Sequence, residues 1–294
     1  MGNIFDLWQD YRINGFCSVF KRILLYIPAH YLLWKTQNTG IKCGINTTET
    51  RRTKVIVSMT SYPERFGEID LCIKSLLLQS YKPDKIIIWF GSDSQERDLT
   101  ESMREYQKYG VEYRFDPQKN LKAHKKYYYA MREFPEDIVI TVDDDAVYPR
   151  NTVRSLIKNY YKHPNAVSAR RVHKITFKNN KINPYDKWKK EYRWAFGERF
   201  DLMAVGVGGV LYPPHCLNEN AFDTNALIDN CINADDIWLK CMETLKKTKV
   251  VWTPCLFCHP PTLRFDRGLS SINSVHNDEY IESVMKLYSI TFPA

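Results

Sequence analysis

Three consecutive carboxylates, Asp143, Asp144 and Asp145, come directly after the apolar run Ile138–Val142. Carboxylates that crowd together raise one another's pKa unless a cation neutralises them. A hard divalent ion with oxygen ligands meets that need, and a diphosphate can complete its coordination shell. We therefore predict a Mg²⁺ or Mn²⁺ site that neutralises a leaving diphosphate. The alternative is an acidic surface turn.

The elements around this run predict an α/β fold. Four short stretches are expected to be strands, with helices between them at Ile69–Leu77, Thr100–Tyr109 and Lys122–Phe134; the strands are Val55–Thr60, Lys85–Phe90, Val111–Phe115 and Ile138–Val142. Alternating strands and helices indicate a parallel sheet covered on both faces. Ligands of such sheets bind beyond the carboxyl ends of the strands, where Asp93 and the acidic run both fall.

Residues 54 to about 280 resemble glycosyltransferases of the GT-A fold, close to the family 2 group that builds bacterial surface polysaccharides. The resemblance rests on four features in order: the opening strand Val55–Thr60, the acidic run after Ile138–Val142, the glycine-rich Gly206–Gly209 and the motif Ala234-Asp235-Asp236. It implies one main domain with a Rossmann-like, mostly parallel nucleotide-binding sheet and an acceptor-binding half.

The resemblance also implies how the nucleotide-sugar donor is bound. Thr60, Tyr62 and Asp93 are expected at the base and ribose, and Lys125 at the diphosphate, where ammonium groups and helix N-termini suit phosphate. Further donor contacts are implied for Asp143, Asp144, Gly208 and Gly209, and metal ligation for Asp145, Asp143 and His259, with His276 as the alternative histidine. The glycines let a backbone approach a ligand, or else belong to a plain strand with glycine packing.

By the same resemblance, Asp236 is the catalytic base of an inverting transferase, and Asp235 faces acceptor or sugar hydroxyls. A carboxylate there would take the proton of the attacking hydroxyl. The other interpretation is helix N-capping, which aspartate at a helix start also performs. An aromatic stretch is expected either to line the acceptor groove or to pack in the core; its members are Tyr185, Trp188, Tyr192 and Trp194.

Residues 1–50 differ from the catalytic domain expected over 51–294. Phe16–Trp34 is aromatic-rich and carries basic residues, and its uncharged run Ile23–Trp34 is shorter than the roughly 20 residues that span a bilayer. It either lies in a membrane interface as an amphipathic segment or packs on the catalytic domain, and Lys35–Arg52 is expected to be a polar linker. The net charge of +8 favours an anionic partner, without any nucleic-acid-binding signature.

The resemblance implies a metal-dependent, hexosyltransferase-like enzyme of surface polysaccharide biosynthesis. It would move a sugar from a nucleoside-diphosphate sugar, UDP-linked by default of the family, to a glycan or lipid-linked acceptor. With eight cysteines and no cleavable signal peptide, a reducing cytoplasmic location is expected, peripheral at the inner face of the membrane. Two alternatives stay open: a metal-dependent nucleotidyltransferase, and a non-catalytic glycan- or membrane-binding relative.

Overall fold

The computed structural model describes residues 16–116, 120–257, 260–261 and 269–293. The chain forms two compact units, of which the first extends to Gly40 and the second comprises Ile41–Ala294. The first unit contains helix α2 (Phe16–Asn38), so Lys35–Asn38, expected as linker, belongs to the helix. Among the described residues, no helix combines the length and the apolar character needed to cross a membrane.

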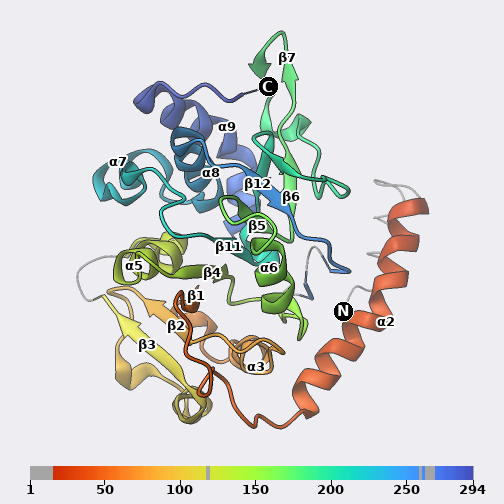
Figure 1. Ribbon diagram of the computed structural model, residues 1–294, viewed down its shortest axis with the longest axis vertical. Coiled ribbons are helices and arrows are strands. Elements are labelled where there is room, and N and C mark those ends of the chain that lie inside the picture. The colour runs from red at the N-terminus through yellow and green to blue at the C-terminus, as the bar shows by residue number, and fades with distance from the viewer. Residues whose placement is uncertain (1–15, 117–119, 258–259, 262–268, 294) are drawn as a thin grey trace. The chain divides into compact units, whose positions relative to one another are not determined.

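An eight-stranded sheet runs through the second unit in the order β3-β2-β1-β4-β11-β5-β12-β9 (Figure 1). Its strands are β1 (Val55–Thr60), β2 (Lys85–Phe90), β3 (Val111–Phe115), β4 (Ile138–Val142), β5 (Val167–Ala169), β9 (Glu198–Arg199), β11 (Val210–Tyr212) and β12 (Val250–Trp252). The four predicted strands are confirmed with the predicted bounds, and they pair in parallel. The α/β fold is therefore confirmed. Two small sheets pair β6 (Val172–Lys174) with β10 (Leu202–Ala204), and β7 (Phe177–Lys178) with β8 (Lys181–Ile182).

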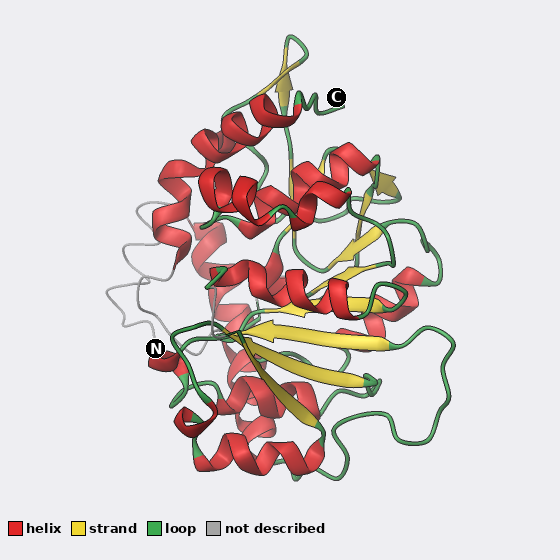
Figure 2. Cartoon of the chain, turned by 90° about the vertical axis from the view of Figure 1, so that its left-hand side faces the viewer, coloured by secondary structure: helices red, strands yellow, loops and turns green. Residues whose placement is uncertain are grey.

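Helices cover both faces of the parallel strands (Figure 2). Helix α5 (Lys125–Glu133) covers one face, where Ile56, Ile87 and Val139 pack against Ala130. Their alternating neighbours Val57, Ile88 and Ile140 pack on the opposite face, against α3 (Asp70–Leu77), α4 (Glu101–Tyr106) and α6 (Thr152–Tyr160). Burial on both faces explains why β1, β2 and β4 are largely apolar runs, whereas β3, at the end of the sheet, alternates apolar with charged residues and is only partly buried after Val111.

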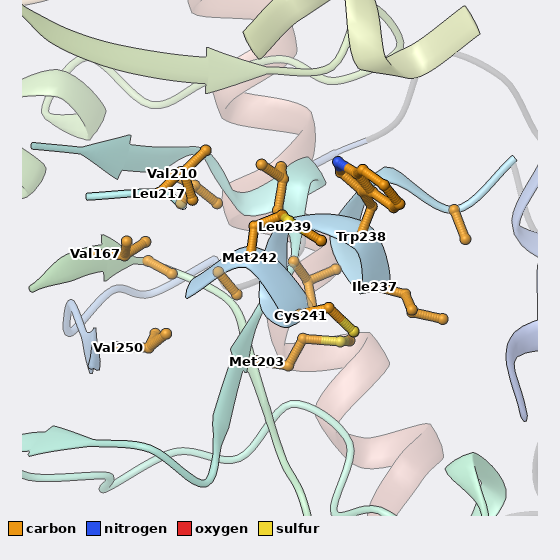
Figure 3. Close-up of a cluster of buried hydrophobic side chains, with 14 of the residues drawn as sticks. Val167, Met203, Val210, Leu217, Ile237, Trp238, Leu239, Cys241, Met242 and Val250 are labelled. Atoms are coloured by element: carbon orange, nitrogen blue, oxygen red, sulfur yellow. The ribbon is translucent and has the colours of Figure 1, made fainter. Parts of the chain in front are cut away.

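A second core lies under the other half of the sheet. It is formed with α7 (Thr224–Cys231), α8 (Asp235–Lys246) and α9 (Leu269–Tyr288). Figure 3 shows α8 side chains among strand residues: Leu239 and Met242 lie on the side of Val210, and Trp238 lies on the other side of the helix. Trp238 is fully buried; its ring contacts Tyr288 of α9, and its Nε1 donates to the Ala221 carbonyl at 3.2 Å, so these two segments anchor the first turn of α8.

The strand directions bring the ends of β4, β5 and β12 to one edge. β11 is antiparallel to both β4 and β5, so β4 and β5 run in the same direction, and β12 is parallel to β5. The loops that follow β4, β5 and β12 therefore leave from the same edge of the sheet.

Candidate active site

The acidic loop after β4 is tied to the glycine turn that precedes β11. The Asp143 amide donates to Tyr148 Oη at 2.9 Å, and that hydroxyl donates to the Val207 carbonyl at 3.2 Å. Beyond it, the Val147 amide donates to the Pro261 carbonyl at 2.9 Å. Hydrogen bonds within the loop and to two separate segments thus set its course.

Asp144 is the buried member of the three consecutive carboxylates. Ser61 Oγ donates to its Oδ2 at 2.5 Å, and the Arg65 guanidinium pairs with its Oδ1. Burial raises the pKa of Asp144 to about 6, although Arg65 and Ser61 act in the opposite direction. Its side chain is 7% exposed, whereas those of Asp143 and Asp145 are 29% and 30% exposed. Asp144 therefore points into the protein, and its two neighbours remain accessible.

Lys126, in the first turn of α5, connects the acidic loop to the start of α8. Its Nζ lies 2.6 Å from Asp143 Oδ1 and 2.9 Å from Asp235 Oδ2, and its side chain is only 4% exposed. Burial lowers the pKa of this ammonium, but Asp143, Asp235 and Asp236 outweigh that effect and raise the pKa well above its ordinary value. Lys126 is therefore a permanent cation among carboxylates from two distant segments.

Asp235 and Asp236 occupy the first turn of α8 and differ in their partners. Burial raises the pKa of both, but for Asp235 the Lys126 ammonium outweighs it and the net shift is downward. The pKa of Asp236 is raised well above its ordinary value by desolvation and by the adjacent Asp235. Asp236 Oδ1 accepts a hydrogen bond from the Gly206 amide at 3.0 Å.

The N-capping interpretation of this acidic pair does not match the structure. The N-cap position of α8 is Ala234, whose side chain makes no capping bond. Both carboxylates still lie where the helix dipole favours negative charge. Their contacts are to Lys126 and Gly206, which are remote in sequence.

Gly206 borders the carboxylates more closely than the two glycines predicted for the donor. A Cβ at Gly206 would lie 3.1 Å from Lys126 Nζ, 3.3 Å from Asp236 Oδ1 and 3.4 Å from Asp143 Oδ1. Gly208 ends the same 3₁₀ turn, and Gly209, at φ +86°, faces Thr152 and Leu156 of α6. The run is thus a turn rather than a plain strand, and its glycine at the carboxylates is Gly206.

Two of the predicted donor residues, Asp93 and Lys125, share one partner. Asn120 Nδ2 donates to Asp93 Oδ2 at 2.8 Å, and Lys125 Nζ donates to Asn120 Oδ1 at 2.9 Å. A side chain on Gly91 would come within 2.9 Å of Asn120, so the glycine makes room for this contact. Burial lowers the pKa of Lys125. The structure brings both residues together beside the end of β2.

Thr60 and Tyr62, the other predicted donor residues, follow β1. Thr60 Oγ1 donates to the Trp89 carbonyl at 2.8 Å, so its hydroxyl is engaged within the sheet. Tyr62 is 36% exposed, and its hydroxyl accepts a hydrogen bond from Arg65 Nε at 2.8 Å. The accessible ring of Tyr62 is therefore linked through Arg65 to the buried carboxylate of Asp144.

The comparisons with known proteins show the family of the chain. The family model described as glycosyl transferase family 2 matches residues 56–215, more than half of the 294-residue chain. The chain belongs to glycosyl transferase family 2. No curated protein matches it.

One solved structure supports the GT-A fold of this family 2 glycosyltransferase. It is similar to the mannosyltransferase PcManGT from Pyrobaculum calidifontis in complex with GDP-Man and Mn²⁺, with a TM-score of 0.51, 15% identity, and coverage of 90% of this chain and 71% of that chain. It is also similar to a 4-diphosphocytidyl-2C-methyl-D-erythritol synthase, with a TM-score of 0.43, 9% identity, and coverage of 76% and 99%. The second likeness is too weak to carry an argument about activity.

The role of His259 or His276 as a metal ligand stays a prediction. His259 lies outside the described residues, two positions before Pro261. His276 lies on α9, where its Nδ1 pairs with Glu279 one helical turn away, at 2.9 Å. Within the described part of the chain, no three Asp, Glu, His or Cys side chains converge as a metal-ligand group.

Sequence reasoning missed Lys126, Arg65 and Asn120. The pair Lys125-Lys126 was visible as a basic helix start, but spacing alone does not say which ammonium faces the carboxylates. Arg65 follows the first strand in the run Tyr62-Pro63-Glu64-Arg65. Its proximity to Asp144 depends on a contact across 79 residues, for which a single sequence carries no signal.

Proposed function

We propose that this glycosyltransferase moves a sugar from a nucleoside-diphosphate sugar to a glycan or lipid-linked acceptor, with inversion, in surface polysaccharide biosynthesis. One observation carries the proposal: Lys126 links Asp143, at 2.6 Å, to Asp235, at 2.9 Å. Asp143, an accessible carboxylate of the acidic loop, therefore lies beside the acidic start of α8. That is the juxtaposition needed to hold a donor next to a proton acceptor.

The donor would lie across the ends of β1, β2 and β4. Tyr62 and Asp93 are available to the nucleoside, and Lys125 to the diphosphate. UDP stays the default expected from the family, while the similar mannosyltransferase was solved with GDP-Man. Both nucleotides therefore belong in the test.

Asp143 and Asp145 fit a Mn²⁺ or Mg²⁺ ion. Their carboxylates are accessible, since Asp144 alone points into the protein, and hard oxygen ligands are those that these ions prefer. Asp145 is the principal ligand in this proposal, and Asp143 and His259 are the further ones predicted. When bound, the ion would neutralise negative charge on the departing diphosphate.

Asp236 would act as the base. Its pKa, raised by desolvation and by Asp235, makes its carboxylate a stronger proton acceptor than an ordinary aspartate. It would take the proton of the acceptor hydroxyl as that oxygen bonds to the anomeric carbon. The bond from that carbon to the diphosphate breaks, and its electron pair leaves with the nucleoside diphosphate. The Gly206 amide holds Asp236 in place, and Lys126 keeps Asp235 ionised.

The decisive experiment is a nucleotide-sugar panel, with UDP- and GDP-linked sugars and Mn²⁺, scored by thermal stabilisation. A donor at a hundredfold excess over its Kd should stabilise the fold by about 2.7 kcal/mol, and Asp145→Asn should lose this response. The product should be a nucleoside diphosphate; release of pyrophosphate would instead identify a nucleotidyltransferase. If no sugar nucleotide stabilises the wild-type protein, the proposal is wrong.

We further propose that α2 lies on an anionic membrane at its cytoplasmic face. Tyr26, Ile27, Tyr31 and Trp34 are each more than half exposed, and at 100° per residue they share an arc of about 140° on the helix. An apolar arc with basic residues on the same helix suits an interface. Replacing Ile27 and Trp34 with glutamate should abolish sedimentation with phosphatidylglycerol vesicles; unchanged sedimentation would contradict this location.

A further inference from the structure

Two aromatic rings between β8 and β10 are open to solvent. Trp194 is 73% exposed and Phe196 is 72% exposed, with ring centroids 6.2 Å apart. The other members of the predicted aromatic stretch are covered: Trp188 is buried, and lysine ammonium groups lie over the rings of Tyr185 and Tyr192. The structure thus divides this stretch into core residues and one exposed ring, Trp194.

The backbone holds Trp194 in an unfavourable conformation. Its φ is +66°, and the φ of Glu191, three residues earlier, is +46°. Both values lie in the left-handed region that L-residues with a Cβ avoid. Such conformations persist where the surrounding structure imposes them, and they cluster at binding sites. Here the support comes from β6: the Tyr192 amide donates to the Val172 carbonyl at 2.8 Å.

The Trp194 ring lies at the edge of the sheet that carries the active site. It packs on Trp252, the last residue of β12, with ring centroids 6.2 Å apart. β12 and β4 run in the same direction, and β11 and β5 separate them. Three strand spacings correspond to about 14 Å, so β12, on whose last residue the ring packs, lies about that far from β4, which the acidic loop follows.

A chain of hydrogen bonds connects Trp252 to Asp236. Trp252 Nε1 donates to the Arg170 carbonyl at 3.2 Å, and the Arg170 amide donates to the Gly209 carbonyl at 3.3 Å. The Gly209 amide donates to Gly206 at 2.8 Å, and the Gly206 amide donates to Asp236 at 3.0 Å. Trp252, on which the Trp194 ring packs, is therefore connected through the backbone to the turn that holds the proposed base.

We propose that Trp194 and Phe196 stack against a sugar ring of an oligosaccharide acceptor, beyond the sugar that carries the attacking hydroxyl. This inference rests on the proposed function and names its acceptor class. Exposed tryptophan supplies a large rigid surface, and such residues dominate binding energy where they are anchored. The carboxylates of Glu191 and Glu198 flank the two rings in the sequence. Arg193 and Arg199 balance these two charges within residues 191–199, so the segment that carries the rings is neutral overall, which suits a neutral sugar.

The test measures binding of matched mono- and disaccharides with UDP, GDP and Mn²⁺ present. Glucose, galactose, mannose and N-acetylglucosamine are compared with cellobiose, lactose, mannobiose and chitobiose by intrinsic fluorescence and saturation-transfer NMR. At least one disaccharide should bind, and W194A should weaken it by about tenfold or more. W194F should retain most of the affinity, and binding of the monosaccharides should change little.

Tyr161 provides the matched control. It is 71% exposed and follows α6, which leads away from the acidic loop to the start of β5, at the opposite edge of the sheet. Y161A should leave disaccharide binding unchanged. Thermal stabilisation by sugar nucleotides is measured on every variant; its absence in the wild type would refute the proposed function rather than this inference.

Two results would overturn the inference. One is that no disaccharide binds the wild-type protein more tightly than W194A. The other is that the wild type sediments with phosphatidylglycerol vesicles and W194A does not, which would make the rings a membrane contact.

Discussion

The acidic loop and the first turn of α8 both carry aspartates, but the carboxylates of the two regions have different partners. In the loop, Ser61 and Arg65 surround Asp144, so the buried carboxylate has dedicated partners and its neighbours stay accessible. At α8, Asp235 has the Lys126 ammonium, and Asp236 has the Gly206 amide. Position in a run of aspartates therefore does not reveal which carboxylate is charged; the partners that the fold supplies decide it.

The largest expected effect tests the difference between Asp236 and its neighbours. Asp236→Asn should lower kcat by about 10²–10⁴-fold, the range of a general base, because the amide cannot accept the hydroxyl proton. Donor binding, followed by thermal stabilisation, should be almost normal. Asp229→Asn on the exposed side of α7 is the control. Equal turnover in Asp236→Asn would remove this residue from the mechanism.

The second prediction breaks the connection between the two acidic regions. Lys126→Met should lower the free energy of unfolding by about 3–5 kcal/mol, because it leaves carboxylates of both regions without their cation. Urea unfolding measures this loss, and Lys126→Arg should restore part of it.

The adjacent Lys125 is the control for that prediction. Its ammonium bonds to the neutral Asn120, so Lys125→Met should cost less, about 1–3 kcal/mol. Equal losses in the two methionine variants would contradict the connecting role of Lys126.

A third prediction disturbs the loop alone. Arg65→Met removes the cation beside Asp144 and Asp145 and should cost about 1.5–3 kcal/mol of stability, as for hydrogen bonds to charged groups. The KM for the donor should rise, while that for the acceptor should stay unchanged. A rise confined to the acceptor KM would show that Arg65 serves the other side of the site.

The smallest effect is a shift in pH dependence. Because the base must be deprotonated, activity should rise as pH increases through the raised pKa of Asp236. Asp235→Asn removes an adjacent negative charge and frees Lys126, so the pKa of Asp236 should fall and the acid limb of kcat should move to lower pH. An acid limb at the wild-type position would show that Asp235 does not tune the base.

The two halves of the sheet also differ in how far the sequence predicted them. β1, β2 and β4 follow from largely apolar runs buried on both faces, and the ends of β2 and β4 locate Asp93 and the acidic loop. β5, β9, β11 and β12 have three residues or fewer, too short for a periodic pattern. Their pairing depends on long-range contacts such as Val250 with Val167.

The sequence by itself determined the α/β class, the parallel strands and the presence of two acidic motifs, because hydrophobic runs and local spacing are properties of neighbouring residues. Only the tertiary structure decided that Lys126 rather than Lys125 faces the carboxylates, that Asp144 points inward to Arg65, and that Gly206 borders Asp236. Each of these depends on a contact between residues that are 30 or more positions apart. Which of the two lysines makes its contact also depends on how α5 is rotated against the sheet. Burial and charge then set the protonation of each carboxylate, and both arise only when the distant segments meet.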